Sequence, residues 1–153
     1  MKPVVVAPGD GRFIAVGSSG AGVTVKVSDN ETDGLCTVWE GRVGPGAVGA
    51  GPHYHRGRDE FFYVLTGELV LRIGDDQHVA PAGTFAFVPR ETIHGFHNAS
   101  RESATILVVH HPAGFERFLE EMQHLAARHG SKEDRAALAT RFDMIPVPAS
   151  RAE

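Results

Sequence analysis

Cysteine is almost missing from this sequence, which contains a single one, Cys36. One thiol can form neither a disulfide framework nor a cysteine-rich zinc site, so the chain fits a reducing, cytoplasmic setting. Long apolar runs are missing too, since none approaches the roughly twenty residues of a membrane span. The apolar run near the N-terminus, VVVA, is too short for the core of a signal peptide. We therefore expect a cytoplasmic protein with no membrane partner.

The sequence also lacks a concentration of positive charge. Its 15 Lys and Arg residues are scattered and outnumbered by 19 acidic residues, for a formal net charge of −4. Such a chain offers no electrostatic footprint for a polyanion, so we expect no nucleic-acid partner. Tryptophan and methionine are scarce, with one and three residues, whereas histidine occurs nine times. Because histidine is the commonest metal ligand, the positions of these residues need close attention.

Short runs rich in Val, Ile, Phe, Thr and Tyr, separated by Gly, Pro, Asp and Asn clusters, fill residues 4–110. This rhythm is typical of short antiparallel strands, and it predicts an all-β fold: a sandwich, jelly roll or barrel. The strict alternation at residues 23–27 indicates a half-buried strand, whereas the continuous apolar run at 61–65 indicates a strand covered on both faces. The predicted strands lie at residues 4–6, 13–16, 23–27, 35–42, 53–55, 60–66, 69–73, 78–79, 84–88, 94–98 and 105–110.

After His111 the spacing becomes helical. Apolar residues recur every three or four positions from Phe115 to Ala126, with Glu116 on the opposite, polar face. Such a stripe is usually core or subunit interface and less often a lid over a ligand. Ser131 with Asp134 three residues on is a weak capping-box signal for a second short helix. We expect a single domain, with a β-barrel at residues 1–111 and a helical appendage at 112–153 packed on it.

Four residues in two stretches carry the side chains of a metal site. On a strand, side chains at i and i+2 share a face, so His53 and His55 project two imidazoles the same way. Glu60 opens the next strand, where antiparallel pairing could place its carboxylate beside them, and His94 is the fourth candidate. Three imidazoles and one carboxylate suit one divalent transition metal and leave about two coordination positions open. The ligand set does not distinguish among Mn, Fe, Co, Ni, Cu and Zn.

The spacing of these residues resembles a known family. The stretch His53-x-His55-x4-Glu60-x6-Gly67, followed by Gly83-x5-Pro89-x4-His94-x3-Asn98, looks like the two signature motifs of the cupin superfamily. The wider chain is similar to small bacterial cupins related to quercetin 2,3-dioxygenase, which share a segment like residues 112–116 and a tail like residues 135–142. The resemblance implies a cupin barrel, that is, a jelly roll or double-stranded β-helix, with one or two C-terminal α-helices. It also implies a homodimer, for which residues 4–6 are a candidate exchanged strand.

Two positions depart from the motifs. Ala47 and Glu91 stand where the family usually has glycine. If the turn at Glu91 requires a positive φ, that residue is strained, unless the turn is of another type or Glu91 has a purpose near the mouth of the barrel.

The same resemblance implies a metal-dependent dioxygenase acting on an aromatic or enolisable small molecule. In that family the carboxylate corresponding to Glu60 acts as general base on the substrate hydroxyl, which makes Glu60 the catalytic candidate. Two other functions stay open, because cupins are diverse and function resides in the site. One is a non-catalytic module that binds a small molecule. The other is an isomerase or cyclase, for which Tyr54, Tyr63 and Glu91 are weak acid/base candidates.

Apolar residues around the metal could line a pocket for an apolar or aromatic substrate, although ordinary barrel filling explains them equally well. The candidates are Phe62, Val64, Phe85, Phe87 and Phe96. Among the remaining histidines, His97 has the opposite strand parity to His94 and should face away. One of His110 and His111 must face inward, but the end of the strand is the favoured explanation for that pair.

Overall fold

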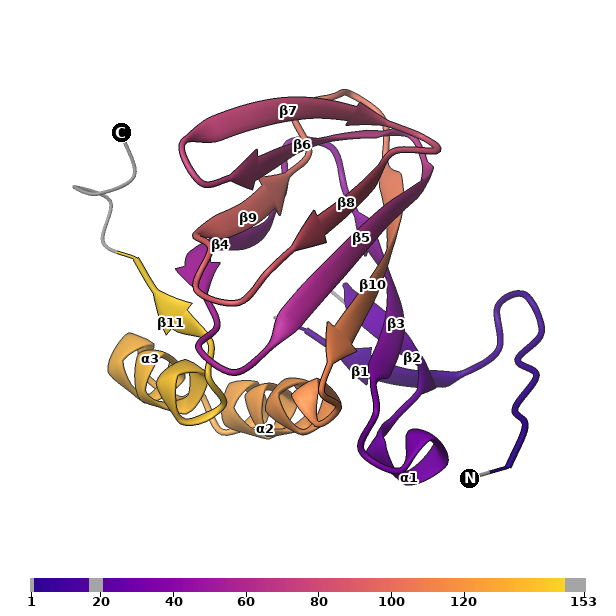
Figure 1. Cartoon of the computed structure of the whole chain (residues 1–153). Helices are drawn as coiled ribbons and strands as arrows, with labels where there is room; N and C mark the ends of the chain where they lie inside the picture. Colours follow the sequence, from indigo (N-terminus) through magenta and orange to yellow (C-terminus); the bar gives the residue numbers. More distant parts are fainter. Residues whose placement is uncertain (1, 17–20, 148–153) are drawn as a thin grey trace.

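Eleven strands form two antiparallel sheets in the computed structural model, which describes residues 2–16 and 21–147. In the first sheet the order is β1 (Arg12–Ala15), β2 (Gly22–Val27), β3 (Thr37–Val43), β10 (Ala104–His111), β5 (Asp59–Thr66) and β8 (Phe85–Val88). In the second it is β11 (Ile145–Pro146), β4 (Val48–Tyr54), β9 (His94–His97), β6 (Glu68–Ile73) and β7 (Asp76–Pro81). The helices are α1 (Asp29–Thr32), α2 (Phe115–Ala127) and α3 (Lys132–Arg141). Figure 1 shows the two sheets facing each other, with α2 and α3 beneath one end.

Alternating side chains of the central strands build the core between the sheets. Along β10, Ala104, Ile106 and Val108 are fully buried while their neighbours are less so. The sheet opposite contributes Leu69 and Leu71 of β6. This is the period-two pattern of a strand with one face in the core. The prediction of an all-β jelly roll with C-terminal helices is confirmed.

The helical segment closes one end of the barrel. Phe115, Phe118, Leu119 and Leu125 of α2 are buried, as the helical spacing predicted. Glu116 is also buried, which corrects its assignment to the polar face. Its carboxylate accepts hydrogen bonds from the Thr37 hydroxyl and from backbone N–H groups at Asp29 and Gly114. It therefore ties α2 to β3 and to the short helix α1, which the sequence did not predict.

The capping box proposed for the second C-terminal helix is present. The Ser131 side chain accepts from the Asp134 N–H at 3.0 Å, and the Asp134 carboxylate accepts from the Ser131 N–H at 2.9 Å. After α3 the chain returns along β4, where β11 pairs Ile145 with Tyr54. This last strand was expected only as an extended tail, and Pro148 of that tail lies outside the described residues.

The remaining differences concern strand ends. Residues 4–6 form no strand, and Val5 is 96% exposed. The strand expected at residues 53–55 begins earlier, at Val48, and ends at Tyr54, so it contains His53 but not His55. Gly67, with a φ of 71°, turns the chain from β5 into β6, and a side chain there would meet the Ser103 carbonyl at 2.7 Å. Within the described residues, no helix is long and apolar enough to cross a membrane.

Candidate metal centre

The four predicted ligands meet inside the barrel, near the end covered by the helices. His53 near the end of β4 pairs directly with His94 at the start of β9, and Glu60 lies at the start of β5. One ligand atom from each of His53, His55, Glu60 and His94 lies within 4.8 Å of all the others. All four residues are buried, at most 3% exposed. A compact, buried set of three imidazoles and one carboxylate fits a divalent transition metal.

Backbone carbonyls hold all three imidazoles in place. The Nδ1 atom of His53 lies 2.8 Å from the Gly51 carbonyl oxygen, and that of His94 lies 2.8 Å from the Thr92 carbonyl oxygen. For His55 the acceptor is distant in sequence, since its Nδ1 lies 2.6 Å from the carbonyl oxygen of Asp143. With Nδ1 donating, Nε2 is the nitrogen left for a metal, and this arrangement is the usual support of a metal-binding histidine.

The Nε2 atoms of two of these imidazoles converge on one carboxylate oxygen. Glu60 Oε2 lies 3.2 Å from His55 Nε2 and 2.7 Å from His94 Nε2. Burial alone would raise the pKa of Glu60, but the imidazoles of His110, His55 and His94 hold that pKa well below its ordinary value. Glu60 is therefore ionised at neutral pH, as a metal ligand must be.

The histidine ligands differ in their protonation. Burial lowers the pKa of His53 to about 4, and the neighbouring His94 acts in the same direction. Burial would also lower the pKa of His94, but its hydrogen bond to Glu60 outweighs that effect and raises the pKa above the ordinary value. His53 is thus neutral and ready to bind, whereas His94 is the ligand from which an incoming metal would displace a proton.

The sequence reasoning gave too little weight to His110. The side chain is fully buried, and its Nε2 lies 3.6 Å from Glu60 Oε1, whereas His55 and His94 are hydrogen-bonded to the other carboxylate oxygen, Oε2. Burial lowers the pKa of His110 to about 3, so the ring is neutral. The signal was present in the strand parity, because residues 104, 106, 108 and 110 alternate inward along β10. His110 is therefore an inward-facing residue, and strand termination does not explain it.

Aromatic and cationic side chains pack together between Glu60 and the first residue of helix α2, Phe115, which is one of them. The His110 ring stacks on the Phe115 ring at a centroid distance of 3.8 Å and faces the Trp39 ring at 6.1 Å. The guanidinium carbon of Arg58 lies 5.6 Å from the centre of the Phe115 ring. We call Trp39, Arg58, His110 and Phe115 the cover layer. None of these four residues was among the predicted site residues.

The pocket prediction is partly wrong. Phe85 and Phe87 are 61% and 49% exposed, so they lie on the outside of the barrel and cannot line its interior. The register explains this, since Glu60 pairs with Val88, which places Val88 on the inner face and the residues next to it on the outer one. Phe62, Val64 and Phe96 do face inward, where they pack within the hydrophobic core.

Other predicted residues also lie away from the ligands. Tyr63 is 41% exposed and Glu91 is exposed, so neither is an acid/base partner for a buried site. Tyr54 lies on β4 with parity opposite to His53. Glu91 has a φ of 67°, so its turn does require the left-handed region, and its N–H donates to the His55 carbonyl at 2.6 Å. Ala47 does not have a positive φ, whereas the preceding residue, Gly46, has a φ of 66°.

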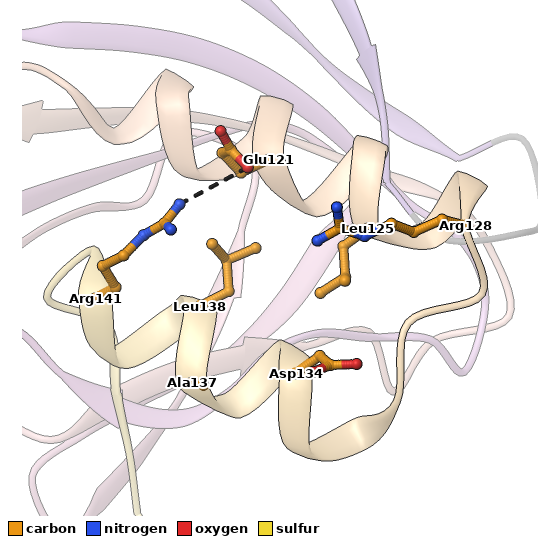
Figure 2. Close-up of a pocket in the computed structure, with 7 residues that line it drawn as sticks. All are labelled: Glu121, Leu125, Arg128, Asp134, Ala137, Leu138 and Arg141. Atoms are coloured by element: carbon orange, nitrogen blue, oxygen red, sulfur yellow. Dashed lines mark ion pairs between the residues drawn. The ribbon is translucent and has the colours of Figure 1, made fainter.

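Two surface hollows are separate from the ligand cluster. Figure 2 shows one of about 210 Å³ between α2 and α3, where Arg141 forms an ion pair with Glu121. The other, of about 240 Å³, lies on the second sheet and includes Phe96 and His97 in its lining. No metal ligand lines either hollow, and the charged lining of the first is that of an ordinary interhelical groove.

Comparison with known proteins gives a consistent picture of the fold. The family described as Cupin domain matches residues 39–110, a span that contains all four ligands. A protein from Thermotoga maritima described as a predicted oxalate decarboxylase has 20% identity and a TM-score of 0.64, over 71% of this chain and 99% of that one. No curated protein matches the sequence significantly.

Two further solved structures carry different names. A sugar phosphate isomerase of the cupin superfamily from Silicibacter pomeroyi has 26% identity and a TM-score of 0.58, over 70% of this chain and 79% of that one. The polyketide cyclase RemF from Streptomyces resistomycificus has 23% identity and a TM-score of 0.59, over 72% of this chain and 79% of that one. The shared fold thus accompanies several activities, and the site itself must indicate the chemistry.

Proposed function

Residues 39–110 match the family described as Cupin domain, and from this match we propose that the protein is a metal-dependent enzyme, a dioxygenase acting on an enolisable small molecule. The observation that carries the proposal is the buried cluster of His53, His55, Glu60 and His94, with every imidazole anchored through Nδ1. A divalent transition ion held there would act as a Lewis acid on a substrate oxygen.

The protein's own part in the chemistry centres on Glu60. Its Oε2 faces the ligand imidazoles, whereas its Oε1 faces His110. A carboxylate with one oxygen outside the ligand cluster can take a proton from a substrate hydroxyl within hydrogen-bond reach. His110 Nε2 faces that oxygen at 3.6 Å, beyond hydrogen-bond distance, so the ring lies beside the base without restraining it. The interior around these groups is buried, so bulk water is excluded from the reacting atoms.

An isomerase or cyclase is the second candidate, and the pair formed by Glu60 and His110 favours it. Moving a proton between two carbons requires a base and an acid near each other, and these two side chains face one another at 3.6 Å. The names of the Silicibacter pomeroyi and Streptomyces resistomycificus neighbours are compatible with such chemistry. A module that binds a small molecule without turnover is the remaining alternative.

Elemental analysis of the purified protein, followed by oxygen uptake with flavonols and other enolisable aromatics, tests the proposal. We expect near-stoichiometric metal and oxygen consumption with at least one reconstituted metal. Glu60→Gln should keep much of the metal but lose turnover, whereas His78→Asn, at an exposed position on β7, should change neither. Absence of oxygen consumption with every metal would contradict the dioxygenase proposal. Equal loss of metal and turnover in Glu60→Gln would make Glu60 a ligand only.

A further inference from the structure

The cover layer contains more hydrogen-bond donors than the protein satisfies. Five buried nitrogens have no hydrogen-bond partner among the described residues: Trp39 Nε1, Arg58 Nε and Nη1, and both ring nitrogens of His110. Indole and guanidinium nitrogens only donate, and a neutral imidazole donates from one nitrogen. Buried polar groups in folded proteins are nearly always paired, so a cluster of this kind marks a place where an acceptor from outside the chain binds.

Charge narrows the identity of that acceptor. Arg58 forms no ion pair with any described residue, although the carboxylates of Glu60, Glu116 and Asp143 are all nearby in the fold. Those carboxylates accept hydrogen bonds from imidazoles, a hydroxyl and backbone N–H groups instead. Arg58 is half-buried, and its buried Nε and Nη1 have no partner although carboxylates lie nearby; unpaired donors on a cation favour an anionic occupant over a neutral one.

The position of the cover layer further restricts which acceptor can bind there. His110 touches both Phe115 and the free oxygen of Glu60, so the unpaired donors begin directly beside the ligand cluster. A divalent ion with Glu60 as its one carboxylate ligand would keep a net positive charge, to which Arg58 adds another. An anionic group bound here would therefore be attracted by the metal ion and by Arg58, against the weaker repulsion of the Glu116 and Asp143 carboxylates, which already accept hydrogen bonds within the protein.

We propose that Arg58, together with His110 and Trp39, forms a subsite for the carboxylate of a small organic acid that binds beside the metal. The inference rests on the proposed function for the location of the reacting atoms, and it makes the substrate an acid. The guanidinium supplies the charge and unpaired N–H donors at Nε and Nη1. The indole and imidazole supply neutral donors, and Phe115 packs against the carbon skeleton.

The single tryptophan of the chain provides a local readout, because Trp39 belongs to the cover layer. Its fluorescence is followed while metal-loaded protein is titrated with acetate and benzoate and, as neutral matches, with acetamide and benzamide. We expect at least one carboxylate to bind about tenfold or more tightly than its amide, as a charged hydrogen bond would give. If neither carboxylate is preferred over its amide, the subsite does not exist.

Variants of the β4–β5 loop assign the effect to one side chain. Arg58→Gln should abolish the preference for carboxylate, Arg58→Lys should keep part of it, and Arg56→Gln should leave it unchanged. Arg56 is the matched control because it lies in the same loop with an exposed side chain. Carboxylate binding by a folded Arg58→Gln protein with wild-type affinity would overturn the assignment.

Two further measurements separate the alternatives. Nitrate is titrated as an inorganic anion, and Arg58-dependent binding of nitrate without binding of either organic acid would overturn the organic-acid proposal. The metal content of each protein is measured alongside. An empty wild-type centre would refute the proposed function, whereas Arg58-dependent carboxylate binding in that metal-free protein would still uphold the subsite.

Discussion

Replacing Asp143 should weaken metal binding even though this residue is not a ligand. Its carbonyl accepts from His55 Nδ1, and its carboxylate accepts from the N–H groups of Arg56 and Gly57, both at 2.9 Å. Asp143 also has a φ of 64°, a conformation that aspartate tolerates better than alanine. One side chain thus holds the C-terminal segment against the loop that connects two ligands.

The magnitude follows from these contacts. Asp143→Ala removes two hydrogen bonds worth about 1 kcal/mol each and adds a left-handed strain of about 1 kcal/mol. We expect unfolding of the metal-free protein to become easier by roughly 3 kcal/mol, less where water replaces the exposed bonds. If the lost contacts let the backbone carbonyl of residue 143 shift, His55 Nδ1 loses its hydrogen-bond acceptor. Loss of such a support typically lowers metal affinity by about 10- to 100-fold.

Competition with a chromophoric chelator measures the metal affinity, and urea unfolding in EDTA measures the stability. Asp143→Asn keeps one side-chain oxygen and should show a smaller loss, and Asp143→Gly isolates the lost hydrogen bonds from the strain. Asp134→Ala is the matched control, because it removes the capping box of α3 at a cost of about 1 kcal/mol without touching a ligand. Wild-type metal affinity in Asp143→Ala, or an equal loss in Asp134→Ala, would refute the reasoning.

Four other outcomes are expected. For protein kept at a free metal concentration about 1,000 times the dissociation constant, removing the metal should lower the free energy of unfolding by about 4 kcal/mol. An unchanged melting temperature after chelation would contradict this. Phe62→Ala, a core truncation, should lower the free energy of unfolding by about 3–5 kcal/mol. Phe87→Ala on the outer face should change the same quantity, measured by urea unfolding, by no more than about 0.5 kcal/mol. Similar losses in the two variants would mean that the outer face is covered. Glu91→Gly should relieve left-handed strain and stabilise by up to about 1 kcal/mol, so marked destabilisation in a thermal melt would show that Glu91 has another purpose. In EDTA the pKa values of His53 and His110 are lowered by burial to about 4 and about 3, so the unfolded chain binds protons more tightly at both. The stability present above pH 6.5 should therefore fall as the pH drops to 4, by roughly 3 kcal/mol for each group, less what the raised pKa of His94 adds back on acidification. A net rise on acidification would contradict this.

The ligand set could be predicted from sequence because it depends on local rules. His53 and His55 share a strand face by parity, and Glu60 follows within one turn, so only His94 required the spacing of a known motif. The same parity should have placed His110 inside, since every second residue of β10 before it is apolar and buried. The end of the strand gave a competing explanation, and the pairing of β10 with β5 decided between the two.

Long-range pairing could not be predicted. The sequence shows that Phe85 and Phe87 share a face but not which face, and only the pairing of β8 with β5 places them outside with Phe61. The contact between His55 and Asp143 likewise joins a strand end to a segment that no local pattern relates to it. The expectation of a homodimer stays a prediction, which light scattering on the purified protein would test.

The hydrogen bond from His55 to Asp143 spans 88 residues and therefore affects the order in which the protein matures. During synthesis, all four ligands have left the ribosome well before the C-terminal segment that supports His55. A nascent chain that has completed its barrel strands thus holds the right imidazoles without the carbonyl that orients one of them. A chain that stops before Asp143 should therefore hold the metal less tightly than one that includes this residue.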